Sequence, residues 1–435
     1  MRITLDGEAI EAREGDTVAA ALLRARITTF TRSIKYHRPR GPFCLAGSCG
    51  QCLMRIDGVP SLPSCQVRAQ EGMICERQNA PLGLIDADLF RATDFLFPEG
   101  LDHHHLMVGS RVLGRMALEV ARRLAGLGEL PSKARAAAPA ELRNAPLVVI
   151  GAGPSGLAAA RAAAEAGSKV LLLEREARPG GAALLGVDPA SPDADWVAQQ
   201  ARAFTAAGGE ILLEADCVGL YAGEPAPPAN ALLAVRKGAK LVIVAAERVI
   251  VANGGASQPL PFPGVDRPGV YAARGLLALH VNCNLRVGGE LVVLGDGQEL
   301  VDCARALRRA GYRLARIVAL GGERPDAPDL EVQVAQPVRA LGNPVRALEV
   351  AAGPATDRIR CDALAIALSP APLHGLASSV GATAKWVAAL GGFPLEIDAD
   401  GRTAVQWLFA AGRVAGLGGA GAPKSGEAAG KAACR

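Results

Sequence analysis

Four cysteines near the start of the chain have the spacing of a thiolate cluster site. Cys44, Cys49 and Cys52 follow the pattern C-x4-C-x2-C, and Cys65 follows after twelve further residues. This spacing is typical of a [2Fe–2S] cluster, which a tight loop and one more distant cysteine hold through four thiolates. A zinc site and a loop of inert thiols are the alternatives, although zinc sites more often pair two C-x2-C motifs. Cys75 lies outside the pattern, and we expect it to be a small buried residue.

A glycine-rich turn between two apolar runs is the second feature that predicts chemistry. The apolar run from Leu147 ends at Gly151, an alanine-rich helical segment follows, and the next apolar run ends at Glu174. In a dinucleotide-binding βαβ unit such glycines allow a tight turn, and the helix N-terminus attracts a pyrophosphate. The closing acid lies where it could bind ribose hydroxyls; a glycine turn that only packs the unit is the alternative. The predicted nucleotide-binding residues here are Gly151, Gly153, Pro154, Ser155, Gly156, Glu174 and Arg175.

Two further glycine motifs extend or repeat this site. Gly180 and Gly181 form a second turn, where a backbone without side chains can approach the cofactor. A second βαβ pattern occurs later in the chain, and its Gly295 and Gly297 match the fingerprint. Leu300 stands where the third glycine belongs, and no acid directly closes the next strand. NAD(P)H binding in this second unit and a Rossmann-shaped domain with an empty site therefore both remain open.

Length, charge and cysteine usage restrict the class of protein. A chain of 435 residues with a net charge of +4 and scattered arginines has no footprint for nucleic acid or for an anionic membrane. We find no signal peptide and no membrane span. Ten cysteines without a secretory signal favour metal or redox use, so we expect a cytoplasmic protein. The consecutive histidines at 103–105 suggest a metal, but neighbouring residues on a helix diverge, so a polar helix start is preferred.

The elements that would position the cysteines can be read from local patterns. Arg2 to Ala12 predicts a β-hairpin around the turn dipeptide Asp6-Gly7, and a capped helix is expected from Val18 to Arg26. These elements are typical of a β-grasp ferredoxin. An amphipathic helix between residues 113 and 127 would connect this module to the nucleotide domains.

The segments around the cysteines also resemble a known family. Arg32 to Gly41, the loop from Pro42 to Cys52, and Glu71 to Met73 are similar to the N-terminal region of the α subunits of heteromeric amino-acid oxidases and dehydrogenases. This family includes sarcosine oxidase, opine oxidase, hydrogen cyanide synthase and dye-linked proline or hydroxyproline dehydrogenases. The resemblance covers almost the whole chain. It implies an α/β fold with two Rossmann-like domains of the glutathione-reductase type behind a ferredoxin-like α+β domain.

The domain order that follows from this resemblance has five parts. We expect a [2Fe–2S] domain at 1–85, a helical connector and linker at 86–145, the first half of an FAD-binding domain at 146–255, an inserted NAD(P)-binding-like domain at 256–360 and the second FAD-binding half at 361–435. Apolar runs near residue 363 and residue 408 are assigned to this last part, together with a hairpin at 395–403 and a closing helix from Ser425.

The resemblance also implies which further residues complete the first nucleotide site. Asn253 and Gly254 occupy the position of the usual Thr-Gly pair, and Gly412 is expected to lie at the cofactor. In most such flavoproteins the next residue is an acid that binds the ribityl chain, whereas here it is Arg413. The sarcosine-oxidase branch is similar in this respect and holds NAD at that site. FAD is the preferred occupant and NAD is its rival.

The function implied by the family is electron transfer. Since no redox C-x2-C lies in the core, disulfide reductase chemistry is not expected, and no catalytic triad or carboxylate pair can be assembled from the sequence. The resemblance implies that the amine is oxidised on a partner subunit. That partner would be a β subunit resembling D-amino-acid oxidase, acting on sarcosine, proline, hydroxyproline or an opine; further small subunits are compatible with this prediction. The chain lacks the long C-terminal aminomethyltransferase-like extension of sarcosine oxidase α subunits, so no folate site is expected. A self-sufficient NAD(P)H-dependent reductase and a subunit that holds a nucleotide without turnover are the alternatives.

Overall fold

The protein forms two compact units, each built from two stretches of the chain. The computed structural model describes residues 1–33, 38–79, 110, 112–116, 119, 139–223, 229–238, 240–322 and 324–435. Unit 1 combines Met1–Arg135 with Pro259–Ala367, and unit 2 combines Ala136–Gln258 with Leu368–Arg435. The insertion thus runs from Pro259 to Ala367 rather than over the expected 256–360. The histidines at 103–105 and most of the expected connector helix lie outside the described residues.

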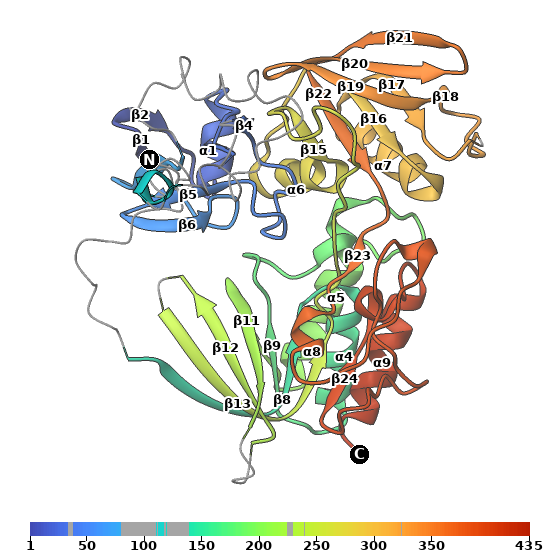
Figure 1. Cartoon of the computed structure of the whole chain (residues 1–435). Helices are drawn as coiled ribbons and strands as arrows, with labels where there is room; N and C mark the ends of the chain where they lie inside the picture. The colour runs from blue at the N-terminus through green and yellow to red at the C-terminus, as the bar shows by residue number, and fades with distance from the viewer. Residues whose placement is uncertain are drawn as a thin grey trace. The chain divides into compact units, whose positions relative to one another are not determined.

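The N-terminal part of unit 1 is a mixed sheet with one buried helix (Figure 1). Its elements are β1 (Arg2–Leu5), β2 (Glu8–Glu11), α1 (Val18–Arg24), β3 (Thr31–Arg32), β4 (Pro39–Arg40), β5 (Leu53–Ile56), β6 (Val59–Pro63) and β7 (Ile74–Arg77). The sheet order is β2-β1-β7-β5-β6, in which only the β1–β7 pair is parallel. Asp6 and Gly7 both adopt positive φ, as the two-residue turn of a hairpin requires. Thr17 caps α1 by accepting the N–H of Ala20 at 3.2 Å.

The inserted part of unit 1 is a second α/β domain. Its elements are β15 (Val270–Ala272), α6 (Ala273–Cys283), β16 (Glu290–Gly295), α7 (Gly297–Arg309), β17 (Arg313–Ala319), β18 (Val332–Val334), β19 (Gln336–Gly342), β20 (Val345–Ala352), β21 (Ala355–Arg360) and β22 (Ala363–Ala367). The parallel sheet has the order β15-β22-β16-β17-β18, and β19, β20 and β21 form an antiparallel meander. Strand β22 therefore belongs to this sheet and not, as expected, to the last part of the chain. It pairs with β15 and β16 along its buried length.

Unit 2 is built on a seven-stranded sheet with helices α4, α5 and α9 against it (Figure 1). Its elements are β8 (Glu141–Ile150), α4 (Pro154–Glu165), β9 (Val170–Leu173), η3 (Gly181–Leu185), α5 (Ala194–Ala206), β10 (Glu210–Leu212), β11 (Ala215–Ala222), β12 (Ala231–Lys237), β13 (Lys240–Val251), β14 (Gly255–Ala256), β23 (Ala371–Pro372), α8 (Gly375–Ser378), η4 (Ala388–Leu390), β24 (Leu408–Ala410), η5 (Gly412–Ala415) and α9 (Gly421–Ala432). The strand order is β10-β9-β8-β13-β12-β11, with β24 added to β13. The expected hairpin at 395–403 is replaced by isolated bridges to Ala384 and Phe409.

The last residues of β8 show that the sheet of unit 2 packs against a cluster of buried side chains on each of its two faces. Leu147 and Val149 face the cluster of buried side chains that includes α4 and α9, whereas Val148 and Ile150 face the cluster on the other side. Successive side chains of a strand point to opposite faces, so an unbroken apolar run suits a strand that is covered on both. The glycine turn therefore follows directly on a strand that is packed on both faces.

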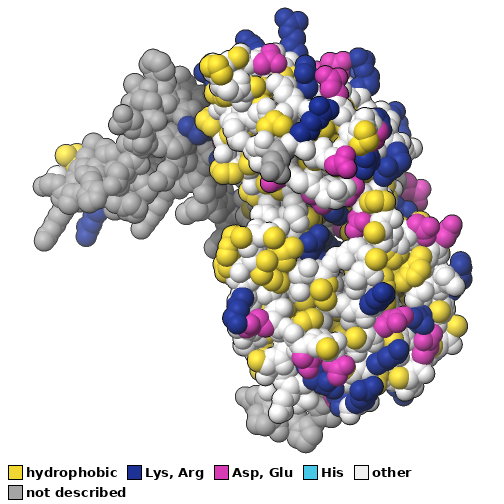
Figure 2. Space-filling view, turned by 90° about the vertical axis from the view of Figure 1, so that its right-hand side faces the viewer, with side chains coloured by type: hydrophobic (Ala, Val, Ile, Leu, Met, Phe, Trp, Pro, Cys, Tyr) yellow, Lys and Arg dark blue, Asp and Glu magenta, His cyan; other side chains and the backbone are white. Residues whose placement is uncertain are grey.

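The surface of the molecule mixes charges of both signs. On the face drawn in Figure 2, basic and acidic side chains are interspersed, in line with the small net charge of +4. Among the described residues, no helix combines the length and the apolar character needed to cross a bilayer.

Candidate cofactor sites

The four predicted cluster cysteines are gathered at one end of the N-terminal domain. Cys44, Cys49 and Cys52 lie in the loop between β4 and β5, and Cys65 follows β6. Three of these thiols are almost fully buried, while Cys49 is partly exposed. The backbone bends tightly because two glycines of the loop adopt positive φ.

Contacts between thiols connect the four cysteines in a chain that runs from Cys49 through Cys44 and Cys65 to Cys52. The bond between Cys49 and Cys44 lowers the pKa of Cys44 and raises that of Cys49. The bond between Cys65 and Cys52 lowers the pKa of Cys52, and a bond with Cys44 raises the pKa of Cys65. The four sulfur atoms therefore lie together as the sequence pattern requires.

The donor set fits a dinuclear cluster. Four neighbouring cysteines suit two irons, each of which takes two thiolates. The N–H groups of Ala46 and Ser48 point at Cys44 Sγ, at 3.4 and 3.3 Å. Such bonds stabilise negative charge on sulfur and tune a cluster. Within the described residues, no three His, Cys, Asp or Glu side chains are arranged around a single point as ligands of one metal ion.

Cys75 provides a contrast within the same domain. It lies in β7 with its side chain fully buried, and burial raises the pKa of its thiol to about 12. It is a small core residue, as expected from its position outside the pattern.

Two of the three glycines of the first nucleotide loop, Gly151 and Gly156, have no room for a side chain, whereas the space around Gly153 is open. Gly151 has a φ of +98°, and a Cβ there would lie 2.7 Å from the carbonyl oxygen of Ala252. A Cβ on Gly156 would collide with the carbonyl oxygen of Gly151. Helix α4 therefore begins directly behind β8, with Pro154 in its first turn. Its free N–H groups form the anion site that a pyrophosphate requires.

Glu174 ends the next strand, and its carboxylate turns back to this loop. The side chain is buried; Oε2 accepts the N–H of Ala152 at 2.8 Å and Oε1 accepts that of Glu176 at 2.9 Å. Burial raises the pKa of Glu174, and the two backbone hydrogen bonds oppose that shift. Arg175 points elsewhere, with Nε 3.8 Å from Glu176 Oε1.

The second glycine turn lies against the first. The N–H of Gly180 donates to the carbonyl oxygen of Ala152 at 2.8 Å. A Cβ on Gly181 would lie 3.2 Å from the Cα of Gly153. The structure thus brings the two predicted turns together although more than twenty residues separate them in sequence.

The predicted residues of the last segment also reach this loop. Gly412 lies against the hydroxyl of Ser155, and its N–H donates to Ser425 Oγ at 3.3 Å. The side chain of Arg413 runs beside Gly418, where a Cβ would lie 3.4 Å from Nη2. The position expected to bind a ribityl chain therefore carries a guanidinium, which can pair with phosphate or carboxylate groups.

Asn253 supplies an observation that points to a ligand. Its Nδ2 donates to the carbonyl oxygen of Leu373 at 3.0 Å, but its buried Oδ1 has no partner among the described residues. An unsatisfied buried acceptor costs about 1–3 kcal/mol, which a ligand hydroxyl or N–H group would recover. The Cα of Asn253 is 3.2 Å from where a Cβ of Gly151 would lie, and Gly254 follows it with positive φ. The first site therefore fits a nucleotide.

The second glycine loop is arranged differently. Gly295 packs against β22, and Gly297 begins α7. Asp296 caps that helix, since Oδ1 accepts the N–H of Gly297 at 2.8 Å. Glu299 in the first turn is only 10% exposed and forms a bidentate pair with Arg274, at 2.6 and 2.9 Å. Two carboxylates of the chain itself thus lie where a pyrophosphate would need a positive helix end.

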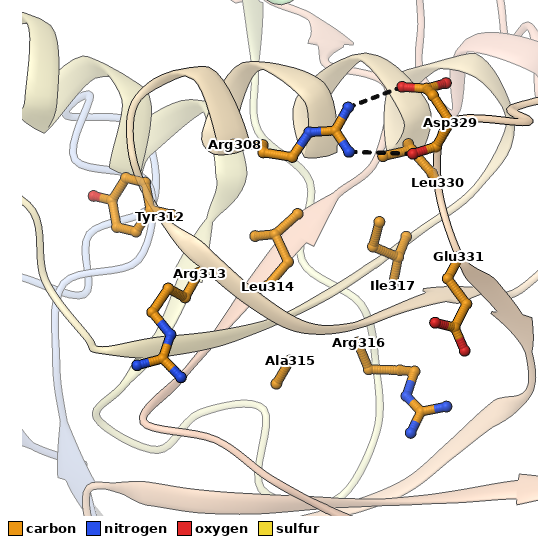
Figure 3. A pocket seen from close by; sticks show the side chains of 10 residues that line it. All are labelled: Arg308, Tyr312, Arg313, Leu314, Ala315, Arg316, Ile317, Asp329, Leu330 and Glu331. Carbon is orange, nitrogen blue, oxygen red and sulfur yellow. Dashed lines mark hydrogen bonds and ion pairs between the residues drawn. The ribbon is translucent and has the colours of Figure 1, made fainter.

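A cavity in the inserted domain lies away from this loop (Figure 3). Its walls are the end of α7, the first half of β17 and the segment before β18. Arg308 binds the carboxylate and the backbone carbonyl of Asp329 at 3.0 and 3.1 Å, and Arg313, Arg316 and Glu331 point to the same side in Figure 3. Nucleotides bind beyond the carboxyl ends of parallel strands, whereas this cavity borders the amino-terminal half of β17.

Two contributors to the first site were not predicted. Ala152 holds both Glu174 and Gly180 through its backbone, so its side chain gives no signal in the sequence. Ser425 was expected at the start of the closing helix, but α9 begins at Gly421 and the hydroxyl contacts Gly412 from within it. A hydroxyl one turn inside a glycine-rich helix could have suggested this contact.

Two family models match the chain where the two sites lie. The "2Fe-2S iron-sulfur cluster binding domain" matches residues 1–80, and the "NAD(P)-binding Rossmann-like domain" matches residues 149–209. These matches confirm the predicted cofactor classes: the chain has a [2Fe–2S] domain followed by a dinucleotide-binding fold.

Two of three relatives of known name match most of the chain, and the third matches a short part of it. The sarcosine oxidase alpha subunit of Rhizobium meliloti (strain 1021) is 30% identical over 419 residues, which is 89% of this chain and 41% of the relative. An opine oxidase subunit of Agrobacterium tumefaciens (strain Ach5) is 26% identical, with 63% of this chain and 62% of the relative covered. The hydrogen cyanide synthase subunit HcnA of Pseudomonas aeruginosa is 33% identical, over 18% of this chain and 75% of the relative.

Solved structures share the fold. The L-proline dehydrogenase from P. horikoshii superposes with a TM-score of 0.68 at 19% identity, covering 95% of this chain and 68% of that one. The thioredoxin reductase of Lactococcus lactis gives a TM-score of 0.51 at 18% identity, covering 66% and 97%. The expected fold class, a ferredoxin-like domain with two Rossmann-like domains, is thereby confirmed.

The extent of these matches decides what can be concluded from them. The chain spans less than half the length of the sarcosine oxidase α subunits that it matches. Its cysteine loop, its first glycine loop and its domain order nevertheless agree with the resemblance seen in the sequence. The chain therefore belongs to the family of α subunits of heteromeric amino-acid oxidases and dehydrogenases, together with its sarcosine oxidase and opine oxidase relatives.

Proposed function

We propose that this chain is the electron-transfer subunit of a heteromeric, flavin-dependent enzyme that oxidises an amino acid or a secondary amine of the sarcosine, proline, hydroxyproline or opine type. The observation that carries the proposal is the presence, in one chain, of four neighbouring cysteines and a complete glycine loop with a buried acid. A flavin accepts electrons in pairs and releases them singly, and a [2Fe–2S] cluster carries one electron at a time.

In this proposal the cluster is held by Cys44, Cys49, Cys52 and Cys65. Their thiols are the groups that hydrogen-bond with each other, and three of them are screened from solvent. The backbone N–H groups near Cys44 lower the cost of placing negative charge there.

The nucleotide is held by the first glycine loop. The start of α4 takes the pyrophosphate, Glu174 lies next to the ribose position, and Asn253 Oδ1 accepts a hydrogen bond from the ligand. Gly180, Gly181, Gly254 and Gly412 let the backbone approach it. FAD is the preferred occupant, and NAD is the rival that Arg413 favours, because a guanidinium binds phosphate better than it binds a ribityl hydroxyl.

The amine is oxidised on a partner in this proposal. Several relatives are named as subunits of oxidases or of hydrogen cyanide synthase, which supports the presence of a partner. We infer a flavoprotein β subunit similar to D-amino-acid oxidase, working in the cytoplasm.

The test uses the full chain purified anaerobically, alone and with candidate β subunits. Iron, acid-labile sulfide and the mass of the released nucleotide are measured first. We expect about two irons and one dinucleotide per chain. Cys65→Ser should lose the iron and keep the nucleotide, whereas Cys75→Ser, a matched buried thiol, should keep both. Wild-type protein that contains neither iron nor dinucleotide contradicts the proposal.

Reduction experiments separate the proposed function from its alternatives. We expect amine substrate to reduce the cluster only when the partner subunit is present. Reduction by NADH in the absence of any partner would instead identify a self-sufficient reductase. If the bound nucleotide is not reduced under either condition, its role in this chain is structural only.

A further inference from the structure

The loop that carries the first cluster cysteine rests on helix α6 of the inserted domain. The N–H of Ala272, at the start of α6, donates to the carbonyl oxygen of Phe43 at 2.9 Å. One turn further, a Cβ on Gly275 would lie 2.6 Å from the carbonyl oxygen of Cys44 and 3.0 Å from its carbonyl carbon. Any side chain at position 275 would therefore displace the backbone of Cys44.

The other end of α6 is also held by the N-terminal domain. Arg24, the last residue of α1, donates through Nη2 to the carbonyl oxygen of Cys283 at 2.9 Å. The same guanidinium binds the buried carboxylate of Asp16 at 2.8 and 3.1 Å, which fixes its direction. A second ion pair joins Arg40, beside the loop, to Asp266 at 3.3 Å. Helix α6 is thus fastened at both ends.

We propose that α6 supports the cluster loop and that Gly275 is a positioning residue, which sets where the Cys44 thiolate meets the iron. The inserted Rossmann-like domain then serves the cluster rather than a nucleotide of its own. The arrangement of its own glycine loop supports this role, because Asp296 and Glu299 place negative charge at the start of α7. The inference rests on the cluster ligands proposed above.

The decisive variant is Gly275→Ala in the full chain with its cluster loaded. We expect the electron paramagnetic resonance spectrum of the reduced cluster to change in its g values, and its midpoint potential to shift, because the backbone of Cys44 must move. Gly295→Ala is the matched control, since it crowds β22 in the same domain without contacting the cluster loop. It should lower the Tm and leave the cluster spectrum unchanged. A Gly275→Ala spectrum and potential equal to those of the wild type would overturn the proposal.

A measurement without any variant covers the case in which Gly275→Ala does not fold. Hydrogen exchange of the wild-type chain is followed by mass spectrometry before and after removal of the iron. Loss of the cluster should increase exchange in peptides from residues 270–283 and leave those from 297–309 unchanged. If α6 exchanges equally in both states, the supporting role is wrong. If the wild type never contains iron, the ligand assignment fails instead, and the two failures are distinguishable.

Discussion

The two Rossmann-like domains of this chain share the same strand, turn and helix, but they differ in the charges at the start of that helix. In the first, the start of α4 carries no acidic side chain in its first turn, and both carboxylate oxygens of Glu174 accept backbone N–H groups. In the second, Asp296 and Glu299 fill the corresponding helix start with negative charge. By our proposal a nucleotide phosphate binds at the first position, whereas at the second the carboxylate of Asp296 already occupies the helix start. The comparison teaches that glycine spacing predicts the turn, while the charges around the turn determine whether the turn can bind a nucleotide phosphate.

The largest effect on nucleotide binding should come from Gly156→Val in the first loop. A side chain there collides with the carbonyl oxygen of Gly151, so α4 must move away from β8. Overpacking of this kind costs about 1–3 kcal/mol, which would weaken nucleotide binding about ten- to a hundredfold. The check is the dinucleotide content of the purified chain, by mass spectrometry after denaturation. Unchanged content would break the claim that the first loop is the binding loop.

The largest effect on stability should come from Glu299→Gln, which is not expected to change nucleotide binding. It replaces the carboxylate by a neutral amide, which can accept only one of the two hydrogen bonds from Arg274, in a site where both side chains are mostly buried. We expect the free energy of unfolding to fall by about 2–4 kcal/mol, measured by urea denaturation. Glu290→Gln is the matched control; its pair with Arg313 is exposed, so the change should stay near 0.5 kcal/mol. Equal effects of both variants would contradict a structural role for Glu299.

Glu174→Gln should change the pH dependence of stability. Burial raises the folded-state pKa of Glu174 above its ordinary value of 4.5, so the folded protein binds this proton more tightly than the unfolded one. Stability therefore falls as the pH rises from about 4.5 through the folded-state pKa, by at most about 1.4 kcal/mol per pH unit. The glutamine variant should lose this part of the slope in urea titrations of the nucleotide-free chain. If the free energy of unfolding depended on pH in the same way in both proteins, the raised pKa of Glu174 would be contradicted.

The smallest effect should come from Gly297→Ala in the second loop. The position has open space around a Cβ but a φ of +53°, so the cost should be about 1 kcal/mol. Nucleotide content should equal that of the wild type if, as proposed, the first loop is the binding loop. A loss of nucleotide comparable to that of Gly156→Val would reverse the comparison between the two domains.

Much of the fold could be predicted because its signals are local. The Asp6-Gly7 turn, the cysteine spacing and the run from Leu147 to Glu174 each specify an element within about thirty residues. Strand β22 was assigned to the wrong sheet, since a short, fully buried apolar run reads the same whichever sheet it joins.

The parts of the sites that escaped prediction depend on the backbone or on distant pairs. The contact of Gly275 with Cys44 joins a glycine to a carbonyl group, and neither carries a side-chain signal. Arg274 and Glu299 belong to different helices, so their pairing follows only from tertiary packing. The unpartnered Oδ1 of Asn253 likewise became visible only when its neighbours among the described residues were in place.

The first nucleotide domain is interrupted in sequence, and this has a consequence for how the protein matures. Its loop at residues 151–156 is completed only by Gly412 and α9, whereas the cysteines and α6 lie earlier in the chain. At about 5–20 residues per second, roughly 10–50 s of translation separate the glycine loop from the helix that closes it. On the ribosome, the residues proposed to bind iron and sulfide therefore emerge first, and those proposed to complete the dinucleotide site emerge last.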